Sequence, residues 1–242
     1  MKVAAIIQAR MTSTRLPGKV LMEIVGKPML WHIINRLKFS KKLDDIILAI
    51  PDSKENDILE KFAKENNLKY FRGSEEDILS RYYEASKKFN TDVIVRITSD
   101  CPLIDPEIVD KVVEKHLRSK ADYTANILKR TYPKGLDVEV LSFKALEKSY
   151  QETKEQPHRE HVTLYIRGHP EKFKRINVEN EKDFSQMRWT VDEIEDLEFV
   201  REIYKRLYKR RRIFLAKEIV KLLEKEPKLL EINKNIKRKK IR

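Results

Sequence analysis

The 242-residue sequence contains one cysteine, only five glycines and no long hydrophobic run. Because Cys101 is alone, no intrachain disulfide can form, and a reducing compartment is the natural setting. The apolar start, from Met1 to Ile7, is too short for a signal peptide and no cleavage pattern follows it. No other run approaches the roughly 18 apolar residues that a membrane span needs. We therefore expect a cytoplasmic protein without a membrane segment.

The positive charge is concentrated near the C-terminus. The net charge is +13, and residues 201–242 contribute +12 of it, which leaves +1 for the first 200 residues. Such a basic segment could bind nucleic acid, which is one alternative for the function. On a helix, however, Val200, Ile203, Tyr204 and Leu207 fall on one face. This pattern favours a docked amphipathic helix with a solvated basic side, so we expect nucleic acid not to be the partner.

Short β-branched apolar runs alternate with longer amphipathic stretches, a pattern typical of an α/β fold with a mainly parallel sheet covered by helices. We expect early strands at Val3–Ile7, Asp45–Ile50, Lys69–Phe71 and Asp92–Thr98, and helices at Pro28–Lys38, Lys54–Glu65, Glu75–Lys88 and Pro106–Leu117. Later strands are expected at Asp122–Asn126, Asp137–Leu141, Phe173–Val178 and Arg188–Val191, separated by irregular connections, with helices at Glu193–Leu207 and Ile213–Lys225. We expect one domain, residues 1–212, with a C-terminal helical extension, residues 213–242, whose basic end is frayed.

The segment after the first strand has the composition of a phosphate-binding loop. Residues 8–19 read Gln-Ala-Arg-Met-Thr-Ser-Thr-Arg-Leu-Pro-Gly-Lys and carry the cations Arg10, Arg15 and Lys19. A loop at the carboxyl end of a parallel strand opens into the crevice where α/β sheets bind ligands. Guanidinium groups, a lysine, hydroxyls and exposed backbone N–H groups are what a polyphosphate needs. The spacing matches neither a Walker A loop nor GxGxxG, and a solvated basic loop is the alternative.

Two aspartates each follow a short apolar strand. Asp100 follows residues 92–98, and Asp192 follows residues 188–191. If both lie at the carboxyl edge of the sheet, they can share Mg²⁺, which prefers one or two carboxylates together with phosphate oxygens and water. Capping of the following helices is the alternative role for both. Cys101, beside Asp100, is interpreted as a small buried thiol rather than a nucleophile.

Six segments in order resemble one enzyme family. They are residues 8–19, Arg72-Gly73-Ser74-Glu75-Glu76-Asp77, Arg96–Pro102, Gly135–Val140, Arg159-Glu160-His161-Val162-Thr163 and Thr190-Val191-Asp192. Together they resemble the cytidylyltransferases that act on acylneuraminate and 3-deoxy-manno-octulosonate, and most of all the spore-coat polysaccharide (SpsF-like) branch. The resemblance covers about residues 2–235.

This resemblance implies a fold and a site. The fold would be a glycosyltransferase-A-like Rossmann sandwich with helices on both faces of a mixed, mostly parallel sheet, usually dimeric. Asp100 and Asp192 would coordinate Mg²⁺ and, with Lys19, form the catalytic set. The nucleotide would contact Gln8, Ala9, Arg10, Arg15, Lys19, Arg72, Gly73, Ser74 and Asp77, and the acceptor would face Asp137, Glu139 and His161.

The leading hypothesis is thus a Mg²⁺-dependent transfer of a cytidylyl group from CTP to a small acceptor, with release of pyrophosphate, in surface polysaccharide biosynthesis. The chain departs from the sugar-acid enzymes at Thr98-Ser99-Asp100-Cys101-Pro102, where they carry a Gln-Gly-Asp-Glu-Pro type sequence. The aspartate is kept but its neighbours differ, so the acceptor stays open and cytosine is the expected base. A glycosyltransferase that uses a nucleotide-sugar is the enzymatic alternative, since it would share the fold and an Asp–metal–diphosphate site.

Overall fold

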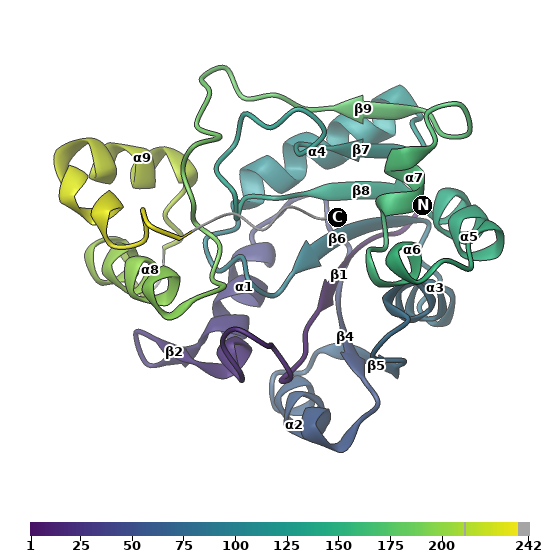
Figure 1. Ribbon diagram of the computed structural model, residues 1–242, viewed down its shortest axis with the longest axis horizontal. Helices are drawn as coiled ribbons and strands as arrows, with labels where there is room; N and C mark the ends of the chain where they lie inside the picture. The colour runs from purple at the N-terminus through teal and green to yellow at the C-terminus, as the bar shows by residue number, and fades with distance from the viewer. Residues whose placement is uncertain (211, 237–242) are drawn as a thin grey trace.

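A seven-stranded sheet in the order β5-β4-β1-β6-β8-β7-β9 organises the computed structural model, which describes residues 1–210 and 212–236 (Figure 1). Strands β1 (Val3–Gln8), β4 (Asp45–Pro51), β5 (Lys69–Gly73) and β6 (Val93–Thr98) run parallel. β8 (Glu139–Ser142) is antiparallel to both β6 and β7 (Tyr123–Ala125), and β9 (Arg175–Asn177) is parallel to β7. The mixed, mostly parallel sheet predicted from the sequence is confirmed.

The alternation of side chains along the central strand divides the core into two layers. Val3, Ala5 and Ile7 of β1 pack on one face of the sheet, and Ala4 and Ile6 pack on the other. All five are buried, as expected for a parallel strand covered on both sides.

Helices cover both faces. The first face carries α1 (Met29–Leu37), α2 (Asp57–Glu65), α4 (Pro106–Ser119), α8 (Ile194–Leu207) and α9 (Ala216–Lys225). The second carries α3 (Ile78–Lys88), α5 (Phe143–Glu152) and α7 (Leu164–Gly168), with the short α6 (Gln156–Glu160) beside them. Figure 1 shows α8 and α9 together on one side of the sheet and α3, α5 and α6 on the other.

The structure differs from the sequence predictions in three places. Residues 143–168 form three helices where irregular chain was expected, and residues 23–28 form a small hairpin of β2 (Glu23–Ile24) and β3 (Lys27–Pro28) that was not predicted. The predicted strand Arg188–Val191 is wrong, since only a single bridge joins Lys134 to Arg188. Its apolar residues Trp189 and Val191 are nevertheless fully buried, because they pack in the core of the first face of the sheet.

The C-terminal residues pack onto the main body. Phe214 is buried against Arg36 of α1, whose guanidinium lies 4.5 Å from the ring centroid, and Ile219 and Leu223 of α9 are buried. Residues 213–236 thus share the core of the first face, and we keep the division at residue 212 as a proposal. The frayed end predicted at residues 237–242 lies outside the described residues. Within residues 1–210 and 212–236, no helix is long and apolar enough to cross a membrane.

Candidate active site

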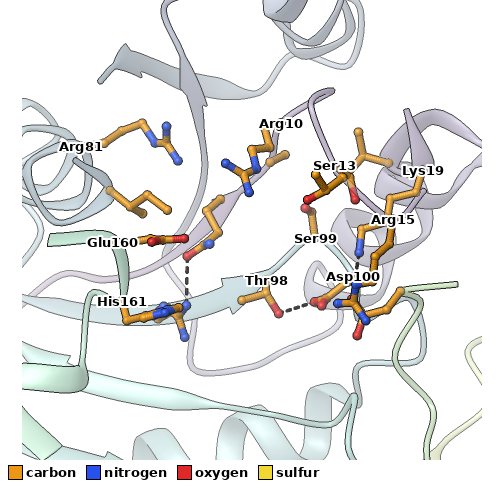
Figure 2. Close-up of a pocket in the computed structure, with 17 residues that line it drawn as sticks. Arg10, Ser13, Arg15, Lys19, Arg81, Thr98, Ser99, Asp100, Glu160 and His161 are labelled. Atoms are coloured by element: carbon orange, nitrogen blue, oxygen red, sulfur yellow. Dashed lines mark hydrogen bonds and ion pairs between the residues drawn. The ribbon is translucent and has the colours of Figure 1, made fainter. Parts of the chain in front are cut away.

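A cavity of about 320 Å³ opens at the carboxyl edge of β1 and β6. It brings together eight of the residues predicted from the sequence, namely Gln8, Ala9, Arg10, Arg15, Lys19, Asp100, His161 and Asp192. Figure 2 shows Lys19, Arg15 and Asp100 at one end of this cavity and Arg81, Glu160 and His161 at the other. Residues from both halves of the chain therefore meet in one space.

The loop after β1 is closed at its base by backbone hydrogen bonds. Gly18 has a φ of 70° and donates its N–H to the carbonyl of Met11 at 2.9 Å. Glycine reaches this left-handed conformation without the steric cost that a Cβ brings. The Met11 N–H is held at 2.9 Å by the side chain of Asn56, which is fully buried. The backbone of the loop that bears the three cations is thus fixed by these hydrogen bonds.

Asp192 lies among four cations. Its Oδ1 is 2.9 Å from Arg15 and 3.1 Å from Lys19, and its Oδ2 is 3.1 Å from Arg188 and 3.6 Å from Lys134. Burial by itself would raise the pKa of Asp192, but Lys19, Lys134 and Arg15 hold that pKa well below its usual range. The carboxylate is therefore charged at neutral pH, and two of its partners belong to the predicted phosphate loop.

Asp100 has a different environment. Its Oδ1 accepts hydrogen bonds from the Thr98 hydroxyl at 2.5 Å and the Cys101 thiol at 3.3 Å, and no ion pair involves it within the described chain. Burial raises the pKa of Cys101 well above its usual value, so this thiol is a neutral donor. The backbone of Asp100 is tied to the other segment, because its carbonyl accepts from the Val191 N–H at 2.8 Å.

The two carboxylates suit a magnesium ion that also binds phosphate. Nowhere in residues 1–210 and 212–236 do three or more His, Cys, Asp or Glu side chains gather as a metal-binding group. Mg²⁺ commonly takes only one or two carboxylates and completes its shell with phosphate oxygens and water. Asp100 is free of cations, and the Arg15 and Lys19 partners of Asp192 are the groups that an incoming polyphosphate would attract. The donor set therefore fits Mg²⁺ in the presence of a nucleotide.

The predicted nucleotide contacts at residues 72–77 do not line the cavity. Arg72 points to Asp57 and Glu60, each 2.6 Å from its Nη1. Ser74 accepts from the Asp77 N–H at 3.0 Å, and Asp77 caps α3 by accepting from the Ser80 N–H at 2.9 Å. An added Cβ at Gly73 would meet the Phe71 ring at 2.9 Å, so this glycine serves local packing. Their binding roles stay predictions.

The predicted acceptor contacts are divided between the cavity and its surroundings. His161 lines the cavity, whereas Asp137 forms a two-bond ion pair with Arg130 at 2.6 and 2.8 Å. Glu139 is buried and contacts Arg96, and it accepts from Tyr123 and Thr163 at 2.5 Å each. Burial would raise the pKa of Glu139, but Arg96 and the two hydroxyls hold it below its usual value. In this structure Glu139 fixes the orientation of Arg96, which does line the cavity.

Several lining residues were not singled out from the sequence: Ser13, Thr14, Val20, Ile78, Arg81, Arg96, Thr98, Ser99 and Glu160. Most of them lie inside the segments that carry the family resemblance, which is the signal that could have identified them. Three lie beyond those segments: Val20 directly follows the first of them, and Ile78 and Arg81 are on α3. On a helix their spacing gives no sign that they face a cavity shared with β1.

Comparisons with known proteins identify the family of the chain. The family model described as cytidylyltransferase matches residues 4–236. The chain belongs to the cytidylyltransferase family. Among its relatives, an uncharacterized protein of Methanocaldococcus jannaschii is 40% identical over all of this chain and 98% of its own length. The spore coat polysaccharide biosynthesis protein SpsF of Bacillus subtilis is 35% identical, over 92% of this chain and 94% of its own.

A solved structure shows the same fold over nearly the whole cytidylyltransferase. It is a cytidylyltransferase from Leptospira borgpetersenii, 35% identical, with a TM-score of 0.91 over 99% of this chain and 100% of its own. The enzyme is thus a nucleotidyltransferase, as the sequence predicts, and its resemblance to the SpsF-like branch is confirmed.

In this cytidylyltransferase, the C-terminal segment supports Asp192 indirectly, through Arg188 and Asp196. Arg188 forms an ion pair with Asp196 at 2.7 Å as well as with Asp192. Asn233 donates to the carbonyl of Arg188 at 3.1 Å and to Asp196 Oδ1 at 3.0 Å, and its side chain is buried. The last buried polar residue of the described chain therefore supports the turn that carries Asp192.

The hydrogen bonds of Asn233 predict that C-terminal deletions are tolerated only up to residue 234. Deleting residues 234–242 should leave turnover and thermal stability nearly unchanged, because Asn233 and its bonds remain. Asn233→Ala in the full chain should lower stability by about 1–3 kcal/mol, because the buried oxygen of Asp196 and the Arg188 carbonyl each lose a donor. Thermal unfolding and pyrophosphate release measure both effects. A large loss of turnover in the truncated but folded enzyme would contradict this boundary.

Proposed function

We propose that this cytidylyltransferase transfers a cytidylyl group from CTP to a small acceptor and releases pyrophosphate. The observation that carries the proposal is the meeting of Arg10, Arg15 and Lys19 with Asp100 and Asp192 in one cavity. In the reaction an acceptor oxygen forms a bond to the α-phosphorus while the bond from that phosphorus to the bridging oxygen of pyrophosphate breaks. Little covalent work falls to the protein, so positioning and charge neutralisation supply most of the rate.

The cations of the phosphate loop would bind the triphosphate. Lys19 Nζ now donates to the Val191 carbonyl at 2.6 Å and to Asp192 at 3.1 Å, and Arg15 contacts Asp192 and Glu193. These contacts hold both side chains at one end of the cavity. Such preorganised cations stabilise charge that develops on the phosphate oxygens without being reoriented during the reaction.

Asp100 and Asp192 would hold Mg²⁺ together with phosphate oxygens. When bound, the ion neutralises phosphate charge and stabilises the leaving pyrophosphate. Arg188 and Lys134 pair with Oδ2 of Asp192, and Thr98 orients Asp100 through its hydroxyl. The chain's own contribution is therefore two carboxylates presented from two segments that a backbone hydrogen bond ties together.

The acceptor is proposed to be a sugar acid, a sugar or a related small molecule used in surface polysaccharide biosynthesis. This follows from the likeness to SpsF, which is named for spore coat polysaccharide biosynthesis. A homodimer is part of the proposal and is tested by light scattering coupled to size exclusion. Screening pyrophosphate release over four nucleoside triphosphates and a panel of acceptors identifies the reaction. Release of nucleoside diphosphate from a nucleotide-sugar, with none of pyrophosphate, would instead support the glycosyltransferase alternative.

Nucleic-acid binding through residues 201–242 is the alternative of another class. Several cations of the described part of this segment are paired with glutamates, such as Arg206 with Glu202 and Arg212 with Glu218. A salt-dependent shift of DNA or RNA that disappears when the segment's unpaired cations are neutralised would favour this alternative.

The phosphate loop gives a direct prediction. Lys19→Ala and Arg15→Ala should each weaken binding of Mg²⁺–CTP and lower kcat/KM by about 10²-fold, because each removes a cation from the proposed triphosphate site. Isothermal titration with CTP and pyrophosphate release measure the two losses. Lys27→Ala, an exposed lysine on the β2–β3 hairpin, is the control. Wild-type affinity in both loop variants would contradict the assignment of the loop.

A further inference from the structure

The end of the cavity away from the phosphate loop contains a buried cation without a counter-ion. Arg81 lies on α3, is 2% exposed and lines the cavity, and Figure 2 shows its guanidinium turned inward. One hydrogen bond is made, from Nη1 to the carbonyl of Ser74 at 2.7 Å. Within the described residues, Nε is buried without a partner, Nη2 makes no hydrogen bond and no carboxylate pairs with the side chain.

The other cations that line the cavity each contact a carboxylate. Arg10 pairs with Glu75 at 4.0 Å, Arg15 and Lys19 pair with Asp192, and Arg96 pairs with Glu139. Burial lowers the pKa of Arg81 to about 10, so the side chain stays protonated at neutral pH. A buried cation with unused donors is costly unless a ligand supplies acceptors. The vacant donors therefore point to a ligand group that offers acceptors at this end.

Arg36 shows how the fold satisfies a buried arginine when no ligand is involved. It is also 2% exposed and unpaired with a carboxylate in the described chain. Its Nε and Nη2 donate to the carbonyls of Ile104 and Phe214 at 2.6 and 2.7 Å, and its guanidinium lies over the Phe214 ring. Arg81 donates to one carbonyl and lacks the second carbonyl and the ring that Arg36 contacts. This difference distinguishes an arginine that binds a ligand from one that only supports the fold.

Two further groups face the same space. The Oε1 of Gln8 accepts from Arg96 at 3.1 Å and from the Tyr82 hydroxyl at 3.3 Å. Because Arg96 can only donate, the amide orientation is fixed and its NH₂ group is left to donate to a ligand. Glu160 also lines the cavity, and its carboxylate forms no ion pair or hydrogen bond in residues 1–210 and 212–236. Its neighbour Arg159 ties α6 to α3 by donating to Asp77 at 2.9 Å.

We propose that Arg81 and Glu160 read the Watson–Crick edge of cytosine. This inference rests on the proposed function, since a triphosphate on the loop at one end directs the nucleoside to the other. Arg81, assisted by Gln8, donates to O2 and N3, and Glu160 accepts from the 4-amino group. Uracil presents an N3–H to the donors and a carbonyl oxygen to the carboxylate, so both positions oppose it. The protein thus presents two donors and one acceptor, which form hydrogen bonds with cytosine and oppose the matching atoms of uracil.

The test measures binding without an acceptor, by calorimetry in Mg²⁺, with CTP, UTP and inorganic tripolyphosphate. Arg81→Met should weaken CTP binding about 10- to 100-fold, the range for loss of a bidentate base contact, and leave tripolyphosphate binding unchanged. Glu160→Gln should bring the affinities for CTP and UTP about tenfold closer, because an amide can present either a donor or an acceptor. Arg36→Met is the matched control and should keep wild-type affinity for all three ligands.

The outcomes separate this inference from the proposed function. Wild-type CTP affinity in Arg81→Met, or an unchanged CTP/UTP ratio in Glu160→Gln, would overturn the base-reading assignment. Parallel loss of CTP and tripolyphosphate binding would also overturn it. Failure of the wild-type enzyme to bind CTP would instead contradict the proposed function. If Arg81→Met unfolds, Arg81→Lys keeps the charge without the planar fork, and it should still lose CTP affinity while retaining tripolyphosphate binding.

Discussion

Asp100→Asn is expected to lower turnover by roughly 10²- to 10³-fold while the protein stays folded. Asparagine keeps an oxygen that can accept from the Thr98 hydroxyl and the Cys101 thiol, so the local hydrogen bonds survive. The negative charge offered to Mg²⁺ is lost. Pyrophosphate release as a function of Mg²⁺ concentration measures the effect, and the midpoint should move to higher concentration.

Asp192→Asn should cause a similar loss of turnover and also a loss of stability. Its carboxylate neutralises Lys19, Arg15, Lys134 and Arg188, so the variant leaves an excess of positive charge in a partly buried cluster. The losses from the two single variants should be non-additive in the double variant, because residues that serve one ion act as a unit. Asp110→Asn, which only caps the turn after α1, is the control. Full activity in either variant would remove that residue from the proposed metal site.

Gly135→Ala is expected to be the most destabilising of the five possible glycine-to-alanine substitutions. Gly135 has a φ of 110°, and an added Cβ would lie 2.5 Å from the Thr190 nitrogen and the Trp189 carbonyl carbon. Backbone strain and steric overlap together should cost about 3 kcal/mol or more. For a chain of this size that corresponds to a fall in Tm of roughly 10 °C.

Gly168→Ala provides the comparison, because an added Cβ there meets nothing within 4 Å. It should be neutral or slightly stabilising, since alanine restricts the unfolded chain. Thermal unfolding measures both variants. If Gly135→Ala melts with the wild type, the close approach between residues 135 and 189–190 is not maintained in solution. If Gly135→Ala folds but has a lowered Tm, turnover should fall as well. The added methyl group displaces Trp189 and Thr190, which directly precede Val191 and Asp192.

The parallel strands were predicted correctly from the sequence, and the phosphate loop could be proposed from it, because both have strong local signals. Val93–Thr98 is an apolar β-branched run, and residues 8–19 concentrate cations in a short loop. Helices α5 to α7 were missed because α5, Phe143–Glu152, buries only a few side chains, and α6 and α7 are five residues each. Short helices are held by tertiary contacts, which local periodicity does not report.

Candidate site residues were predictable where they follow a strand and not where they lie deep in a helix. Asp100 comes soon after β6, and Lys19 ends the charged segment that follows β1, so both lie where α/β sheets bind ligands. Arg81 occupies a helix, where an arginine is usually a solvated surface residue. The burial of Arg81 depends on β5 and Ser74 covering it, which is a long-range consequence of the fold. Arg72 shows the converse, since a family motif contains it but its guanidinium turns toward α2.

The hydrogen bonds that Asn233 donates to Arg188 and Asp196 have a consequence for synthesis of the enzyme. The phosphate loop and Asp100 belong to the first hundred residues, and N-terminal segments emerge and begin to fold first. Asp192 is supported by Arg188 and Asp196, which receive their final donors only when residue 233 is in place. A chain released from the ribosome before that point could collapse around its sheet and still lack a firmly held second carboxylate. Synthesis past residue 233 would then be required for the proposed metal site, and copies terminated before that residue would bind nucleotide without turning it over.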